Sequence, residues 1–185
     1  MSLETYARER SAFRDKVIQH KKRRTVRLGE HLTLLFEDEL TIRYQVQEML
    51  RVERIFEEAG IQGELEAYNP LVPDGGNWKA TMLIEYPDAD ERRRMLAKLK
   101  GLERAVWVQV EGYARVFAVA DEDLERENEE KTSSVHFLRF ELEPPMRAKL
   151  KKGGRLAVGV DHAEYRAVVD AVPEDVRAAL AGDLD

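Results

Sequence analysis

Residues 78–110 read WKATMLIEYPDADERRRMLAKLKGLERAVWVQV, and this stretch decides the predicted fold. Its first nine residues, 78–86, are rich in aromatic and apolar side chains and predict a strand. Pro87 ends that strand, and Asp88 is a suitable N-cap for a helix that continues to Lys100. Gly101 ends the helix, and residues 105–110 predict a second strand. A strand, a helix and a strand therefore follow one another here.

The pattern continues towards the C-terminus. Residues 115–120 predict a strand joined to the preceding one by a turn, 121–131 predict an acidic helix or loop, and 135–142 predict a strongly alternating strand. The order β-α-β-β-α-β over 78–142 is that of a ferredoxin-like unit. A β-rich C-terminal extension follows, with a helix at 144–152, strands at 156–160 and 165–172, and a closing helix at 173–181.

The N-terminal part predicts a helix, a strand and a long helix. They lie at 3–24, at 25–37 with a bend at Gly29, and at 38–59 with Gly60 as C-cap, and an irregular segment follows at 61–77. No linker divides the chain, so we expect one α+β domain over residues 1–185, in which residues 1–24 form a basic helical arm.

The composition excludes several classes of protein. The chain has 185 residues, of which 43% are hydrophobic, so it can build a core without disulfides or metals. It has no cysteine, which excludes thiolate nucleophiles, cysteine-ligated zinc and iron–sulfur ligation. No apolar run reaches the ~18 residues of a membrane span, and the N-terminus lacks an apolar signal core. We therefore expect a cytoplasmic protein.

Basic side chains are concentrated at the N-terminus. Residues 1–27 hold nine Lys and Arg but only three Asp and Glu, whereas the whole chain has a net charge of −6. Lys21, Lys22, Arg23 and Arg24 are therefore candidate anion ligands. The cluster lacks interleaved aromatic residues and the rest of the chain is acidic, which argues against nucleic acid. Alternatively, the basic arm packs on the acidic remainder of its own chain.

Two histidines each lie at the end of an apolar strand face. His136 shares a face with alternate apolar residues of 135–142, and His162 extends the face of 156–160, next to Asp161. His136, Asp161 and His162 are candidate metal ligands or proton-transfer groups. In parallel neighbouring strands the two histidines would be on the order of 20 Å apart, so only an antiparallel arrangement brings them together. A purely structural role is the alternative.

The predicted long helix carries a dense polar set that includes Gln45, Gln47, Glu48 and Arg51. It lacks the Glu-x-x-His spacing of di-metal bundle sites. Pairs of neighbouring charges on the helix surface explain the set, and the alternative is the interface of a homodimer.

Long segments resemble a known family. The stretches LLFEDELTIRYQVQEMLRVERIFEEAGI (34–61), AYNPLVPDG (67–75) and DEDLERENEEKTSSVHFLRFEL (121–142) resemble a family of bacterial proteins, domain-of-unknown-function family 3501, from about Arg24 to the C-terminal tail. The resemblance carries no catalytic residues with it. It implies gene neighbourhoods with rubrerythrin-type proteins and iron–sulfur oxidoreductases, and hence an accessory role in peroxide or redox metabolism.

Three hypotheses on function follow. The first is an accessory protein that binds a protein partner, for which the resemblance implies a redox pathway. The second is a metal-binding protein or metal-dependent enzyme that uses the strand-end histidines. The third is an anion- or nucleic-acid-binding protein that uses the basic arm. No motif identifies a substrate or a cofactor.

Overall fold

The computed structural model describes residues 1–121 and 131–185, and these form an α+β fold, as predicted. The helices of the described residues are α1 (Leu3–Lys22), α2 (Glu39–Glu53), α3 (Glu58–Tyr68), α4 (Ala89–Lys98), α5 (Pro144–Lys151) and α6 (Glu174–Ala181), with 3-10 turns η1 (Asn69–Leu71) and η2 (Leu102–Ala105). The strands are β1 (Thr25–Leu28), β2 (Leu32–Phe36), β3 (Asn77–Ile84), β4 (Val106–Val110), β5 (Val116–Phe117), β6 (Val119–Ala120), β7 (Val135–Glu141), β8 (Leu156–His162) and β9 (Tyr165–Val169).

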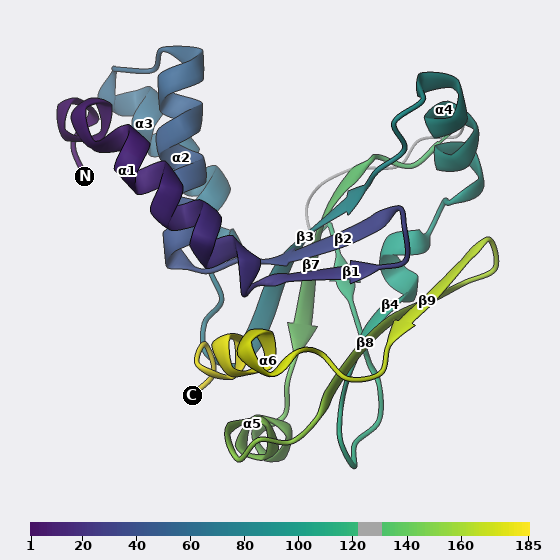
Figure 1. The fold of residues 1–185 in the computed structure, drawn as a ribbon. Helices are drawn as coiled ribbons and strands as arrows, with labels where there is room; N and C mark the ends of the chain where they lie inside the picture. Colours follow the sequence, from purple (N-terminus) through teal and green to yellow (C-terminus); the bar gives the residue numbers. More distant parts are fainter. Residues whose placement is uncertain (122–130) are drawn as a thin grey trace.

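The strands form two antiparallel sheets (Figure 1). The first sheet has the order β1-β2-β3-β7-β6, and the second has the order β5-β4-β8-β9. Side chains alternate between buried and more exposed along β3 and β7, as the period of two in a strand requires. The buried faces of both sheets contribute to one hydrophobic core, to which α4, α5 and α6 add Leu96, Leu150 and Leu180.

The ferredoxin-like unit is not confirmed, because its strands are divided between the sheets. β3 pairs directly with β7, with Trp78 opposite Phe140, whereas β4 pairs with β8 of the C-terminal extension. The predicted strand 115–120 is divided as well, since β5 pairs with β4 and β6 pairs with β7. The chain thus crosses from one sheet to the other within this short segment. Residues 122–130 of the predicted acidic segment lie outside the described residues.

The predicted bent strand at 25–37 is a hairpin. β1 pairs with β2, with Thr25 opposite Leu35, and Gly29 in the turn has a φ of +71°, which favours glycine. Val26 and Leu34 lie opposite each other and are both buried. A hairpin and a bent strand give the same alternation of apolar residues, so the sequence pattern did not distinguish them.

The prediction of one long helix at 38–59 is also wrong, because α2 ends within this range and α3 begins in it. α2 ends at Arg54, which has a left-handed backbone with a φ of 56°, and the N–H groups of Arg54 and Ile55 both donate to the carbonyl of Leu50. This is the usual geometry of a helix C-terminus, with arginine where glycine is most common. The next helix, α3, occupies much of the segment 61–77 that was predicted to be irregular.

Helices α1, α2 and α3 form a three-helix lobe that stands to one side of the sheets (Figure 1). Its own core is small and centres on Ile42, Val46 and Leu50 of α2, against which Ile61 and Leu65 of α3 pack. None of the helices in residues 1–121 and 131–185 is long and apolar enough to cross a membrane.

Candidate functional site

The three-helix lobe joins the first sheet through one buried arginine. Arg24, between α1 and β1, is only 2% exposed. Its Nε donates to the carbonyl of Phe36 at 2.9 Å, and its Nη2 donates to the carbonyl of Glu37 at 3.1 Å. Its two Nη atoms also bind the carboxylate of Asp183 near the C-terminus, with Nη1 at 3.2 Å from Oδ1. This two-point geometry suits the planar guanidinium and links the start of the chain to its end.

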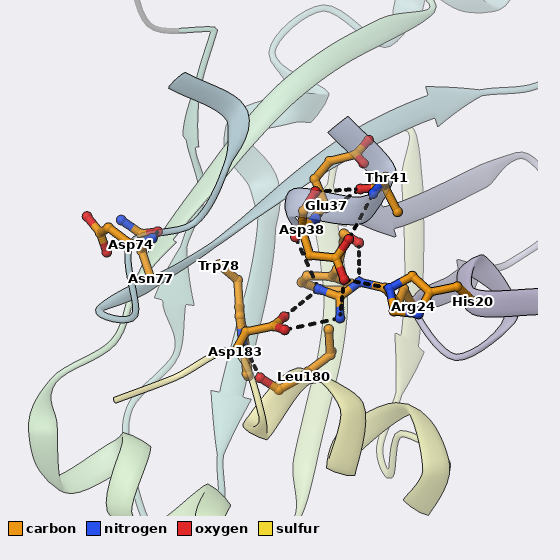
Figure 2. Close-up of polar contacts among 11 residues, drawn as sticks. His20, Arg24, Glu37, Asp38, Thr41, Asp74, Asn77, Trp78, Leu180 and Asp183 are labelled. Carbon is orange, nitrogen blue, oxygen red and sulfur yellow. Dashed lines mark hydrogen bonds and ion pairs between the residues drawn. The ribbon is translucent and has the colours of Figure 1, made fainter. Parts of the chain in front are cut away.

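Asp38 lies at the same junction and contacts both α2 and basic residues at the end of α1 (Figure 2). It is the N-cap of α2, where its Oδ1 accepts from the N–H of Thr41 at 2.9 Å and its own N–H donates to the Thr41 hydroxyl at 2.9 Å. Its Oδ2 accepts from Nε2 of His20 at 2.5 Å and lies 3.4 Å from Nη1 of Arg24. One carboxylate therefore caps α2 and also binds two basic groups from the end of α1.

The two carboxylates beside Arg24 differ in their proton affinity. Burial raises the pKa of Asp38, but the Thr41 N–H, the positive charge of Arg24 and the bond from His20 together outweigh it and place that pKa below its ordinary value. Burial is the dominant influence on Asp183 and raises its pKa despite the bonds from Arg24. The junction thus holds one carboxylate whose pKa lies below its ordinary value and one whose pKa lies above it.

A second polar network holds α1 against α2 within the lobe. The Glu48 carboxylate accepts from the Tyr6 hydroxyl at 2.5 Å and from Nε and Nη2 of Arg10 at 2.7 and 2.8 Å. The bonds from Arg10 are the largest influence on Glu48 and lower its pKa to about 2. Burial, reinforced by Glu48, raises the pKa of Tyr6. Part of the polar set on the predicted long helix is thus internal to the lobe.

A polar cleft and an apolar groove border the lobe. A polar cleft of about 590 Å³ opens beside the junction and is lined by Lys16, Asp38, Glu39, Leu40, Arg43, Val72, Pro73 and Asp183. A mainly apolar groove of about 530 Å³ lies among the three helices and is lined by Met1, Ser2, Leu3, Glu4, Glu39, Ile42, Arg43, Val46, Gln47, Leu50, Ile61, Leu65, Asn69 and Val72. The hollows share Glu39, Arg43 and Val72, so they are neighbours.

His136 is fully buried in β7, with an exposure of 0%. Its Nδ1 lies 2.5 Å from Oδ2 of Asp121, and its Nε2 lies 2.9 Å from both the Thr132 hydroxyl and the Ser133 carbonyl. Both ring nitrogens therefore already have partners. This geometry is that of a histidine that ties neighbouring chain segments together.

His162 and Asp161 lie in the second sheet, in β8, and not beside His136. Nε2 of His162 donates to the carbonyl of Lys100 at 3.0 Å, and its Nδ1 accepts from the N–H of Glu164 at 3.2 Å. Asp161 pairs with Arg115 and Arg166 at 3.3 and 3.5 Å. Among the described residues, no three His, Asp or Glu side chains are grouped so that they could hold a metal ion. The metal site stays a prediction.

The predicted anion cluster is divided by the fold. Arg24 is engaged by internal partners, as described above, and Nζ of Lys21 lies 5.6 Å from the centre of the Tyr44 ring. Lys21 is half-buried, whereas Lys22 and Arg23 are both exposed. The bonds of Arg10, His20 and Arg24 to carboxylates support the alternative that the basic arm packs on acidic parts of its own chain.

Sequence reasoning missed Asp183 and the groove. Asp183 lies 159 positions from Arg24, and no local pattern links the two. The groove depends on the break at Arg54, which folds α3 back onto α2, and the sequence offered Gly60 as the more conventional C-cap.

Comparisons with known proteins place the chain in a family. The sequence profile described as "Protein of unknown function (DUF3501)" matches residues 1–184. A crystal structure described as a novel protein of unknown function from Burkholderia pseudomallei K96243 shares 56% sequence identity with a TM-score of 0.95, and the match covers 100% of this chain and 96% of that one. No curated protein matches. Since the profile spans nearly the entire chain, the protein belongs to the family of proteins of unknown function DUF3501.

Proposed function

We propose that this protein is an accessory protein that binds a protein partner, and that the three-helix lobe is the part that docks. The observation that carries this proposal is a pair of large apolar side chains left uncovered at the α2–α3 turn. Val52 is 61% exposed and Phe56 is 69% exposed. They lie where the chain reverses, and Ile55 between them packs against the core of the lobe. Neighbouring exposed apolar side chains mark interaction surfaces more often than isolated ones do.

The shape of the lobe supports the proposal. The apolar core of the lobe is small, so few apolar residues of α2 and α3 are buried within the lobe. The lobe stands beside the sheets, where a partner can reach it (Figure 1). An exposed aromatic side chain is a suitable anchor for a partner, since aromatic residues contribute much of the energy at interfaces. The further proposal that the partner belongs to redox or peroxide metabolism rests on what the family resemblance implies, with no support from the geometry.

A substitution at Phe56 tests the proposal, and the chain offers a matched control. Phe117 is also exposed, at 50%, but lies in β5 of the second sheet. We expect Phe56→Glu to abolish co-purification of a specific partner from native extract, whereas Phe117→Glu retains it. Equal recovery by both variants, or loss only with Phe117→Glu, would rule out the lobe as the docking surface. A partner with neither redox cofactors nor peroxide chemistry would contradict the redox assignment.

The alternative functions stay predictions with separate tests. Near-stoichiometric iron, zinc or manganese in untagged protein purified without chelator would support metal binding through His136, Asp161 or His162. Salt-dependent binding of phosphate-bearing ligands that is lost on charge reversal of Lys21, Lys22 and Arg23 would support anion binding. A cytoplasmic location and a homodimer also remain predictions, and light scattering at high protein concentration tests the dimer.

A further inference from the structure

The three-helix lobe and the two sheets have separate hydrophobic cores. The core of the lobe centres on Ile42, Val46 and Leu50, and among the described residues it shares no member with the core of the sheets. Figure 1 shows that the lobe meets the sheets at its base and diverges from them beyond it. Parts of a chain that are not joined by a large apolar interface are expected to move relative to each other.

The chain crosses between the lobe and the sheets at three points, all at this base. The crossings are Arg23 after α1, Asp38 before α2, and residues 72–74 after η1. The sheet side begins directly after the third crossing, because the carbonyl of Gly75 accepts from the N–H of Asp185 and from the side chain of Arg147. Residues at the ends of elements are those that absorb the change in backbone angles in a hinge motion. The three crossings therefore have the arrangement of a hinge.

One ion pair connects the base of the lobe to the sheets. The carboxylate of Asp38, the N-cap of α2, lies 3.4 Å from Nη1 of Arg24. Arg24 in turn binds Asp183, whose neighbour Leu184 belongs to the core of the sheets. The pair thus joins the first turn of a lobe helix to the body of the molecule.

Two further polar contacts cross the base. The Thr25 hydroxyl donates to the carbonyl of Lys21 at 2.8 Å, and the Lys79 ammonium donates to the carbonyl of Pro70. Each lies beside a chain crossing, and hence close to the axis of a hinge at the base. The polar cleft of about 590 Å³ beside the base leaves room for movement there.

We propose that the three-helix lobe pivots on the sheets as a rigid body, with Arg23, Asp38 and residues 72–74 as the hinge, and that the ion pair of Asp38 with Arg24 holds the orientation seen in this structure. The 15 residues of α2 make it about 22 Å long, so a pivot of about 10° moves its far end by about 4 Å. That end carries Val52 and Phe56, so the pivot also moves the proposed docking surface. The pivot itself does not rest on partner docking.

Distances between pairs of spin labels test the proposal, and the lack of native cysteine makes the labelling specific. Glu66→Cys on α3 and Ala148→Cys on α5 are exposed positions that span the base. Electron–electron resonance on the full chain should give one narrow distance in wild type. Asp38→Asn removes the charge but keeps an oxygen that caps α2, and it should add a population displaced by about 4 Å or more. An unchanged distribution in Asp38→Asn, or a wild-type distribution already as broad as that of the variant, would overturn the proposal.

Two controls separate a pivot from unfolding. A second label pair, Glu9→Cys on α1 with Glu66→Cys, lies within the lobe and should keep its distance in Asp38→Asn, whereas broadening of this pair would mean that the lobe unfolds and would refute a rigid pivot. Asp88→Asn is the matched substitution, because Asp88 caps α4 outside the junction, and it should leave the distance across the base as in wild type. If Asp38→Asn does not fold, Asp38→Ser, which also keeps a capping oxygen, decides the matter by the same distances.

Discussion

Arg24 is the residue on which the junction between lobe and sheets depends most. Removing its side chain leaves the partly buried carboxylate of Asp183 and two backbone carbonyls without this donor. We expect Arg24→Ala to lower the free energy of unfolding by about 3–5 kcal/mol, as for other broken buried ion pairs. Urea denaturation measures this. Arg23→Ala is the control, since that side chain is exposed and its loss should cost no more than about 0.5 kcal/mol. Similar midpoints for both variants would show that the junction contributes little.

Glu48 gives the protein a specific dependence on acid. Its pKa of about 2 in the folded protein lies below the ordinary value of 4.5, chiefly because of the bonds from Arg10. The folded state therefore favours the ionised form, and this stabilisation is complete above pH 4.5 and is lost as the pH falls towards 2. We expect Glu48→Gln to be less stable than wild type at neutral pH, with the difference shrinking in that acid range. Because the pair is partly exposed, salt should weaken the effect.

Urea denaturation at several pH values checks the Glu48 prediction. Glu53→Gln serves as the control, because Glu53 is exposed at the end of the same helix and should leave the pH dependence unchanged. A difference between Glu48→Gln and wild type that stays constant from pH 7 to pH 2 would contradict the assignment of a lowered pKa to Glu48.

These residues also show where the sequence is uninformative. The basic run at 21–24 is visible in the sequence, but whether a given side chain in it points to solvent or into the protein depends on its partners. For Arg24 the deciding partner, Asp183, lies at the far end of the chain. His136 was recognisable as a buried-strand histidine, whereas its bond to Asp121 required the fold.

At the scale of single elements, the helix end at Arg54 is the feature that sequence signals missed. A left-handed backbone is unfavourable for a residue with a Cβ atom, and glycine avoids that cost. We expect Arg54→Gly to raise the free energy of unfolding by up to about 1 kcal/mol, measured by urea denaturation. Arg54→Ala keeps the Cβ atom and should give no such gain. A loss of stability in both Arg54→Gly and Arg54→Ala would mean that the arginine side chain itself holds the turn.

Elements with conventional local signals were predicted well. Asp88 accepts from the N–H of Glu91 at 2.7 Å and caps α4 as expected, and the strands at 78–86 and 135–142 appear as β3 and β7. Their signals are local, since they depend on a capping side chain or on alternation along one strand. The hairpin at Gly29 and the break at Arg54 depend instead on packing against other elements, which a local pattern does not contain.

For the whole molecule, the order of elements did not determine which strands share a sheet. Every strand pair within residues 1–121 and 131–185 is antiparallel. Hairpins, and crossings at short segments such as 115–120, decide which sheet each strand joins. The α+β class follows from the mixture of helices and alternating strands. The two-sheet arrangement does not, because the same order of elements is compatible with a single ferredoxin-like sheet.

The proposal that residues 1–185 form one domain has a measurable consequence for how the three-helix lobe unfolds. The lobe has its own small core, so its coupling to the sheets depends largely on Arg24 and its bonds to Asp183. We expect hydrogen exchange in rising urea to release the amides of α2 and β3 together in wild type, as one cooperative unit. In Asp183→Ala, the amides of α2 should exchange at a lower urea concentration than those of β3. Asp185→Ala should not have this effect, because Asp185 donates its backbone N–H to the carbonyl of Gly75 and takes no part in the junction. If the amides of α2 already exchange before those of β3 in wild type, the lobe is a separate folding unit and the single-domain proposal is wrong. If α2 and β3 still exchange together in Asp183→Ala, apolar contacts join the lobe to the sheets, and the junction is dispensable for that coupling.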